Sequence, residues 1–198
     1  MSSTGNSTAV AETLAWLDRA VIGLNLCPFA RAVRVKAQIR CVVSEVRDPE
    51  ALLGTLCDEV RLLLATDVAQ CETTLLVHPQ VLTDFGDYND FLDVAEAALD
   101  SMGCAGVLQL ASFHPDYQFA GTDADDVTNA TNRSPYPTLH LLREASIDRA
   151  VAAFPDAAEI YEVNLRTMES LGSAGWQELR EQCRRDAAGP PTGASTAG

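Results

Sequence analysis

The sequence predicts an α/β domain, a single layered unit in which helices cover a small four-stranded sheet and a helical region forms the C-terminus. Segments with the two-residue period of a strand alternate along the chain with segments that have the helical period. Of the 198 residues 47% are apolar, so one core can be buried without disulfides or metals. We expect the domain to span residues 8–186, with disordered tails at 1–7 and 187–198, which have little to bury.

Four segments have the pattern of strands. Residues 38–46 alternate between apolar and polar side chains, and residues 73–78, 107–113 and 138–143 form short, mostly apolar runs. The helices predicted between the first three strands are long enough to connect parallel neighbours. The sheet is therefore expected to be largely parallel or mixed, and the direction of the fourth strand stays open.

Apolar residues at helical spacing predict the helices that cover this sheet. The first is expected behind residues 7 and 8 and ends near Asn25, and the second follows the capping pair Asp48 and Pro49 to about Ala65. The remaining helices are predicted over residues 88–102, 146–154, 155–171 and 176–183. The last three form the helical C-terminus.

Composition excludes several classes of protein. The net charge of −14, from 28 acidic and 14 basic residues, repels nucleic acid and makes it an unexpected partner. The one concentration of basic residues, at Arg31, Arg34, Lys36 and Arg40, favours a small anionic molecule as the partner, although a solvated basic face explains these residues equally well. No apolar run reaches the length of a membrane span, and the first residues lack the basic start of a secretory signal, so we expect a cytoplasmic protein. No dinucleotide-binding, P-loop or serine hydrolase motif occurs. The sequence leaves the oligomeric state open.

Two predicted strands end in the same way. The runs LLVHP and ASFHP each place a histidine, His78 or His114, at the carboxyl end of the strand and a proline directly after it. If these strands are parallel neighbours, both histidines lie at one edge of the sheet. Ligands bind at this edge in open α/β sheets, because loops and helix N-termini converge there. The sequence therefore predicts a site at this edge.

A long segment without regular pattern follows His114. The 26 residues from His114 to Leu139 exceed an ordinary connection, and the aromatic side chains among the polar ones favour a pocket wall or lid over disorder. Candidate substrate-binding residues in and after this segment are Tyr117, Asn132, Tyr136 and, from the end of the fourth strand, Arg143.

Acid/base catalysis without a metal is the first hypothesis for the chemistry. His114 would move a proton, oriented by Asp116 or Asp126, while Arg133 holds a carboxylate or phosphate with its bidentate guanidinium. His140 would support this group. The alternative is a divalent metal such as zinc, held by His78, His114 and His140, although no HxH or HExxH spacing is present.

Cys27 offers a third possibility. If this residue caps a short helix that begins at Pro28, its thiol pKa falls, as a nucleophile requires; otherwise Cys27 fills an apolar corner. The rival to all three enzyme hypotheses is a non-catalytic domain that binds a metabolite, or regulates, through the same pocket. The sequence does not decide whether the protein is an enzyme.

Four stretches resemble a known family. They are GLNLCPFA (23–30), DYNDFLD (87–93), FHPDYQFAG (113–121) and NRSPYPTLHLLRE (132–144). In these stretches the sequence is similar to the bacterial and plant domain-of-unknown-function family 1415, over nearly the whole chain from about Thr13 to Gly175. The resemblance implies the fold of that family and assigns no substrate, cofactor or catalytic residue.

Overall fold

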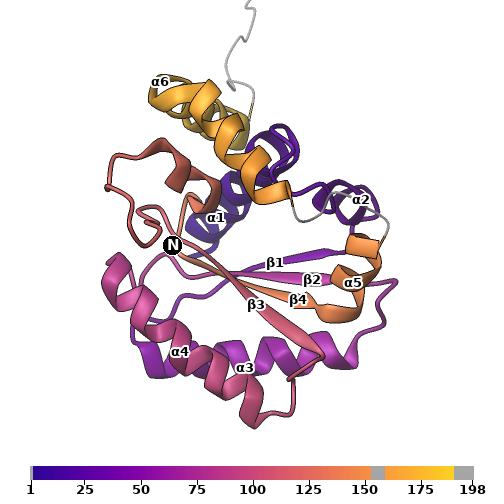
Figure 1. Ribbon diagram of the computed structural model, residues 1–198. Coiled ribbons are helices and arrows are strands. Elements are labelled where there is room, and N and C mark those ends of the chain that lie inside the picture. Colours follow the sequence, from indigo (N-terminus) through magenta and orange to yellow (C-terminus); the bar gives the residue numbers. More distant parts are fainter. Residues whose placement is uncertain (1, 153–158, 190–198) are drawn as a thin grey trace, which may run out of the picture.

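A four-stranded sheet forms the centre of the protein (Figure 1). The structure is a computed structural model that describes residues 2–152 and 159–189. The strands are β1 (Ile39–Val43), β2 (Thr73–Val77), β3 (Leu108–Phe113) and β4 (Thr138–Arg143), in the order β1-β2-β4-β3. β1 and β2 are parallel, whereas β4 runs antiparallel to both β2 and β3. The predicted mixed α/β sheet is confirmed.

The position of β4 corrects one detail of the prediction. β2 and β3 are not hydrogen-bonded neighbours, because β4 lies between them. Both are antiparallel to β4, so they still run in the same direction and end at the same edge of the sheet, where β4 begins. The residues that follow β2 and β3 therefore meet the residues that precede β4.

Two helices, α3 (Pro49–Ala65) and α4 (Phe85–Ser101), cover one face of the sheet (Figure 1). The Asp48 carboxylate accepts a hydrogen bond from the Ala51 amide, so α3 begins as predicted. α4 begins three residues before the predicted start, because Asp84 caps it. The core on this face includes Leu56, Leu76 and Leu139, all fully buried.

The opposite face is covered by α1 (Ser2–Trp16), its π-helical continuation η1 (Leu17–Ile22) and α6 (Ile160–Ala188). α6 is broken at Gly172 (φ 67°, ψ 170°), a backbone conformation that glycine adopts without strain. α2 (Ala30–Val35) and α5 (Glu144–Ala152) lie at the end of the sheet away from the long segment after β3 (Figure 1).

Several predicted helix ends differ from the structure. α1 begins at Ser2, before the start predicted behind residues 7 and 8. The helices expected at 155–171 and 176–183 belong to α6, which reaches Ala188 and so extends past the predicted end of the domain. The predicted break between Phe154 and Pro155 and the end of the chain from 190 to 198 lie outside the described residues. Across the described ranges, no helix has both the length and the apolar character to cross a bilayer.

Candidate functional site

His78 and His114 lie together at the edge where β2 and β3 end, as the sequence predicts. The His78 amide donates to the Pro137 carbonyl, and the His114 amide donates to the Asn132 carbonyl. Both imidazoles lie against Tyr88 of α4, with ring centroids 5.8 Å and 5.1 Å away. Both histidines are fully buried. The pair therefore belongs to the packed interior beneath this edge rather than to an open site.

Both ring nitrogens of His114 are engaged by the backbone. Nδ1 accepts a hydrogen bond from the Asp116 amide at 3.0 Å, so the proton is on Nε2, which donates to the Leu82 carbonyl at 3.3 Å. Burial lowers the pKa of His114. Asp116 thus orients this ring through its amide and not through its carboxylate as predicted. Neither nitrogen is free to exchange a proton with a ligand.

The two ring nitrogens of His78 differ. Nδ1 donates to the Val81 carbonyl at 3.0 Å, while the buried Nε2 has no hydrogen-bond partner in the part of the chain that the structure describes. Burial lowers the pKa of His78 to about 4, so the ring is neutral at pH 7. The Tyr88 hydroxyl beside it donates to the Thr138 carbonyl and accepts from the Phe113 amide. The cluster holds together the strand ends at this edge.

His140 does not join the other two histidines. It pairs in register with Leu75 and packs 6.0 Å from the Phe113 ring on the face covered by α1 and α6. The Thr73 hydroxyl gives its proton to the Leu141 carbonyl, so His140 Nε2 donates to that hydroxyl at 2.6 Å.

The three histidines of the metal hypothesis therefore do not converge, because His140 projects from the opposite face of the sheet. In the described part of the chain, no group of three or more His, Cys, Asp or Glu side chains is placed to hold a metal ion. Whether the protein takes zinc by another arrangement stays a prediction.

The long segment after β3 is ordered by two polar side chains. Asn129, fully buried in the 3₁₀ turn η2 (Val127–Asn132), accepts from the Phe119 amide and the Thr122 hydroxyl and donates to the Asp123 carbonyl. Arg133 donates to the carbonyls of Tyr117 and Ala124. These bonds fold the segment onto itself, so that residues 133–136 form a wall next to α1 and α6.

Three of the predicted binding residues have structural partners instead. The Tyr117 ring packs against Phe85 of α4, and the Asn132 amide donates to the Ser112 carbonyl. Arg143 lies at the other end of the sheet, paired in register with Leu108, because β4 is antiparallel. Its guanidinium donates to carbonyls at the end of α3, including that of Leu63 at 2.6 Å. Arg143 therefore does not lie at the edge where β2 and β3 end.

Cys27 lies in the turn between η1 and α2 and does not cap a helix, because Phe29 is the residue that precedes α2. Burial raises the pKa of its thiol, and the amides of Phe29 and Ala30 oppose this with a smaller effect. The condition for a reactive Cys27, a lowered pKa, is not met. The structure agrees with the alternative, a cysteine that fills an apolar corner.

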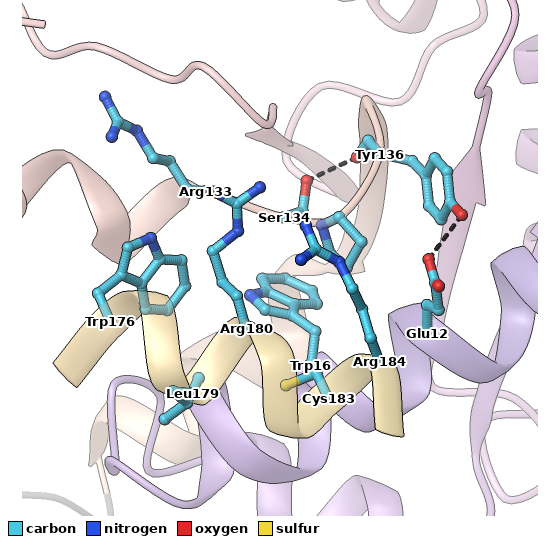
Figure 2. Close-up of a pocket in the computed structure, with 11 residues that line it drawn as sticks. Glu12, Trp16, Arg133, Ser134, Tyr136, Trp176, Leu179, Arg180, Cys183 and Arg184 are labelled. Atoms are coloured by element: carbon cyan, nitrogen blue, oxygen red, sulfur yellow. Dashed lines mark hydrogen bonds between the residues drawn. The ribbon is translucent and has the colours of Figure 1, made fainter. Parts of the chain in front are cut away.

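A cavity of about 250 Å³ lies at the predicted edge, on the side of α1 and α6 (Figure 2). Two predicted residues, Arg133 and Tyr136, line it. α1 contributes Glu12 and Trp16, and residues 133–136 form the wall that precedes β4. α6 contributes one face, which consists of Trp176, Leu179, Arg180, Cys183 and Arg184. The cavity thus lies at the edge that the sequence predicts for the site, and His114 is not among the residues that line it.

Arg180 and Arg184 both line the cavity. They are one helical turn apart on α6, and Figure 2 shows both side chains extending from the helix toward the segment with Ser134 and Tyr136. Among the described residues, neither has a hydrogen-bond or ion-pair partner, although Arg34 and Arg40 are each paired with a carboxylate. Arg180 is also half-buried. The cavity therefore carries two uncompensated positive charges.

The carboxylate at the cavity is bound to a tyrosine rather than to these arginines. The Tyr136 hydroxyl donates to Glu12 Oε2 at 2.6 Å, joining α1 to the segment before β4 (Figure 2). Burial and this carboxylate raise the pKa of Tyr136 to about 12, against the opposing charge of Arg184. Tyr136 therefore stays protonated and keeps the Glu12 oxygen occupied.

Trp176 adds an unsatisfied donor to the same wall. The residue is 6% exposed, and its indole Nε1 is buried with no hydrogen-bond partner in the described structure. In Figure 2 this nitrogen is on the edge of the ring that points away from α6. Burying an N–H donor without an acceptor costs free energy. The indole N–H of Trp176 therefore favours a ligand with an acceptor atom in the cavity.

Sequence reasoning missed the residues that α1 and α6 contribute. Glu12 and Tyr136 are 124 positions apart in the chain, and no local pattern joins them. One signal was present in the last helix, where Trp176, Arg180 and Arg184 follow each other at intervals of four residues and so share one helical face.

Comparison with known proteins gives the family of the chain. The family described as "Protein of unknown function (DUF1415)" matches residues 8–178. The chain belongs to this family. The resemblance found in the sequence motifs is thereby confirmed. No curated protein and no solved structure matches the chain.

Proposed function

We propose that this member of the DUF1415 family is a domain that binds a small anionic molecule in the cavity between α1, α6 and residues 133–136. The observation that carries the proposal is the pair Arg180 and Arg184, which line the cavity and have no carboxylate partner among the residues that the structure describes. Guanidinium groups bind carboxylate and phosphate oxygens through charge-assisted hydrogen bonds. An anion in the cavity would supply the missing partner.

The hydrogen bonds and the burial of the histidines favour a binding site over acid/base catalysis. His114 has both nitrogens bonded to the backbone, and His78 and His114 are fully buried. A general acid or base must reach the proton that it transfers, within hydrogen-bond distance or through one water molecule. The cavity, in contrast, offers positive charge and hydrogen-bond donors, which are sufficient for a binding site.

Titration of the purified protein with small anions tests the proposal. Sodium phosphate and sodium acetate are added against sodium chloride at matched ionic strength, and binding is followed by tryptophan fluorescence and by the melting temperature. Because Trp176 lines the cavity, its emission reports occupancy directly. Saturation at about 100 times the dissociation constant is expected to add about 2.7 kcal/mol to the free energy of unfolding.

Substitutions in α6 give the decisive comparison. The double variant R180Q/R184Q is expected to bind at least about tenfold more weakly, since each lost bond to a charged group is worth about 1.5–3 kcal/mol. The control is R185Q, which removes one exposed positive charge from the same helix, where Arg185 is 3.8 Å from Glu181. Equal affinity in the wild type and in R180Q/R184Q, or no saturable binding of either anion, would refute the proposed function.

A further inference from the structure

The number of charges at the cavity restricts the kind of anion that fits. Three arginines, Arg133, Arg180 and Arg184, and one glutamate, Glu12, line it. Asp116 and Asp126 act on the charge of Arg133, and Glu12 is bonded to Tyr136. The two charges of Arg180 and Arg184 are matched by a dianion and only half matched by a monocarboxylate. A divalent anion also accepts more strongly from each N–H that it meets.

The donors on α6 suit a ligand group with several acceptor oxygens. Arg180 and Arg184 present guanidinium N–H groups, and Trp176 presents a buried indole N–H without a partner. A phosphoryl group has three acceptor oxygens that point in different directions, so it can accept from all three side chains at once. A planar carboxylate has two oxygens, and it leaves at least one donor poorly placed.

The walls opposite α6 limit the size and the orientation of the ligand. A cavity of about 250 Å³ is smaller than the usual site for a drug-sized molecule, so it accommodates a phosphoryl group with a short body. Glu12 on the α1 side repels an anionic group but can accept a hydrogen bond from a neutral hydroxyl. The anionic end is therefore directed toward α6 and the body toward α1.

We infer that the ligand is a phosphate monoester bound as a dianion, with its phosphoryl oxygens held by Arg180, Arg184 and the indole N–H of Trp176. The inference rests on the proposed function, because it names the class of anion for the same site. Arg133 attracts the anion only at long range, because its guanidinium keeps its hydrogen bonds to the carbonyls of Tyr117 and Ala124. Trp176 is the residue that sets the preference for phosphoryl over carboxylate.

Methyl phosphate, sulfate and acetate are the probes that test this inference. At pH 8 methyl phosphate is expected to bind at least about tenfold more tightly than acetate. At pH 5 its apparent affinity is expected to fall about tenfold, because the second pKa of a phosphate monoester is about 6 and only the dianion matches the site. Sulfate is a dianion at both pH values, so its affinity is expected to stay unchanged.

Sulfate also controls for titration of the protein. The other groups that face the cavity are Glu12, Tyr136 and Cys183, besides the arginines. Burial raises the pKa of Cys183, and the pKa of Tyr136 is about 12, so neither loses its proton between pH 5 and pH 8. Any change at Glu12 would affect sulfate and methyl phosphate alike. A pH dependence shared by both probes would overturn the inference.

The variant W176F removes the N–H and keeps an aromatic ring. It is expected to bind methyl phosphate about tenfold more weakly and acetate with little change. If W176F does not fold, R180K replaces it as the test: this variant keeps the charge, loses the bidentate fork, and is expected to weaken methyl phosphate more than acetate. R185Q is the control for both variants.

The outcomes separate this inference from the proposed function. Acetate that binds as tightly as methyl phosphate at pH 8, with both lost in R180Q/R184Q, refutes the phosphate monoester and leaves anion binding intact. Wild-type protein that binds none of the three probes refutes both. Methyl phosphate that binds equally to W176F and wild type removes Trp176 from the set of donors.

Discussion

Replacing His140 by glutamine should remove a defined part of the acid sensitivity of the fold. Burial lowers the pKa of His140 from its ordinary 6.5 to about 4. In the range between these values the unfolded chain binds a proton and the native protein does not, so stability is constant above about pH 6.5 and falls as the pH drops toward 4. Glutamine does not titrate there, and its Nε2 can still donate to the Thr73 hydroxyl that His140 contacts at 2.6 Å.

The magnitude follows from the two pKa values. A native pKa of about 4 against 6.5 in the unfolded chain costs about 2 kcal/mol at pH 5 and about 3 kcal/mol below pH 4. Because part of the residue reaches solvent, the loss is expected at or below these values. At pH 7, where His140 is neutral in both states, H140Q should match the wild type within about 1 kcal/mol, since the hydrogen bond is kept.

Urea unfolding of both proteins between pH 7 and pH 4.5 measures this difference. Carboxylates also titrate in this range, but they do so equally in the wild type and in H140Q, so subtracting the two curves isolates the imidazole. The expected result is a wild-type curve that falls more steeply as the pH is lowered. Parallel curves would show that His140 is protonated as easily in the folded protein as in the unfolded chain, and the assignment of its buried, neutral state would be wrong.

Three further predictions concern the residues whose roles the structure reassigns. R143M should lower the free energy of unfolding by about 2 kcal/mol, because carbonyls at the end of α3 lose a charged donor; R61M, on an exposed helix surface, is the control in the same urea experiment. N129A should cost about 2–3 kcal/mol and also weaken anion binding, since three hydrogen bonds that shape the segment before the cavity are lost; unchanged binding in a destabilised variant would separate the two effects. Cys27 should react with iodoacetamide at pH 7 more slowly than free cysteine, because burial raises its pKa; a rate above that of free cysteine, measured by mass spectrometry, would contradict this.

Most of the regular structure was predictable because its signals are local. The pair Asp48 and Pro49 begins α3 where the sequence places it, and all four predicted strands form. The placement of β4 was not predictable from its own pattern, since an apolar strand has the same period in either direction. Its direction depends on the path of the preceding segment, which Asn129 and Arg133 fix through bonds to irregular backbone.

The edge at which His78 and His114 lie could be predicted from the sequence, and the hydrogen bonds of their ring nitrogens could not. The runs LLVHP and ASFHP place His78 and His114 at one edge because β2 and β3 both run antiparallel to β4 and so in the same direction. What an imidazole can do depends on which groups occupy its nitrogens, and here these are the carbonyls of Val81 and Leu82 and the Asp116 amide. No sequence pattern indicates that a histidine nitrogen is hydrogen-bonded to the backbone. A structural histidine and a catalytic one therefore have the same appearance in the sequence.

The two sides of this edge are connected through a few residues before β4. On the α4 side, the Tyr88 hydroxyl donates to the Thr138 carbonyl and the His78 amide donates to the Pro137 carbonyl. On the α1 side, the adjacent Tyr136 donates to Glu12 at the cavity. The buried histidine cluster therefore holds the backbone that carries the cavity wall, without contributing a side chain to the cavity. His78 and His114, which the sequence predicts for the site, therefore lie next to the cavity. Its positive charge comes from Arg180 and Arg184, close to the C-terminal end of the described chain.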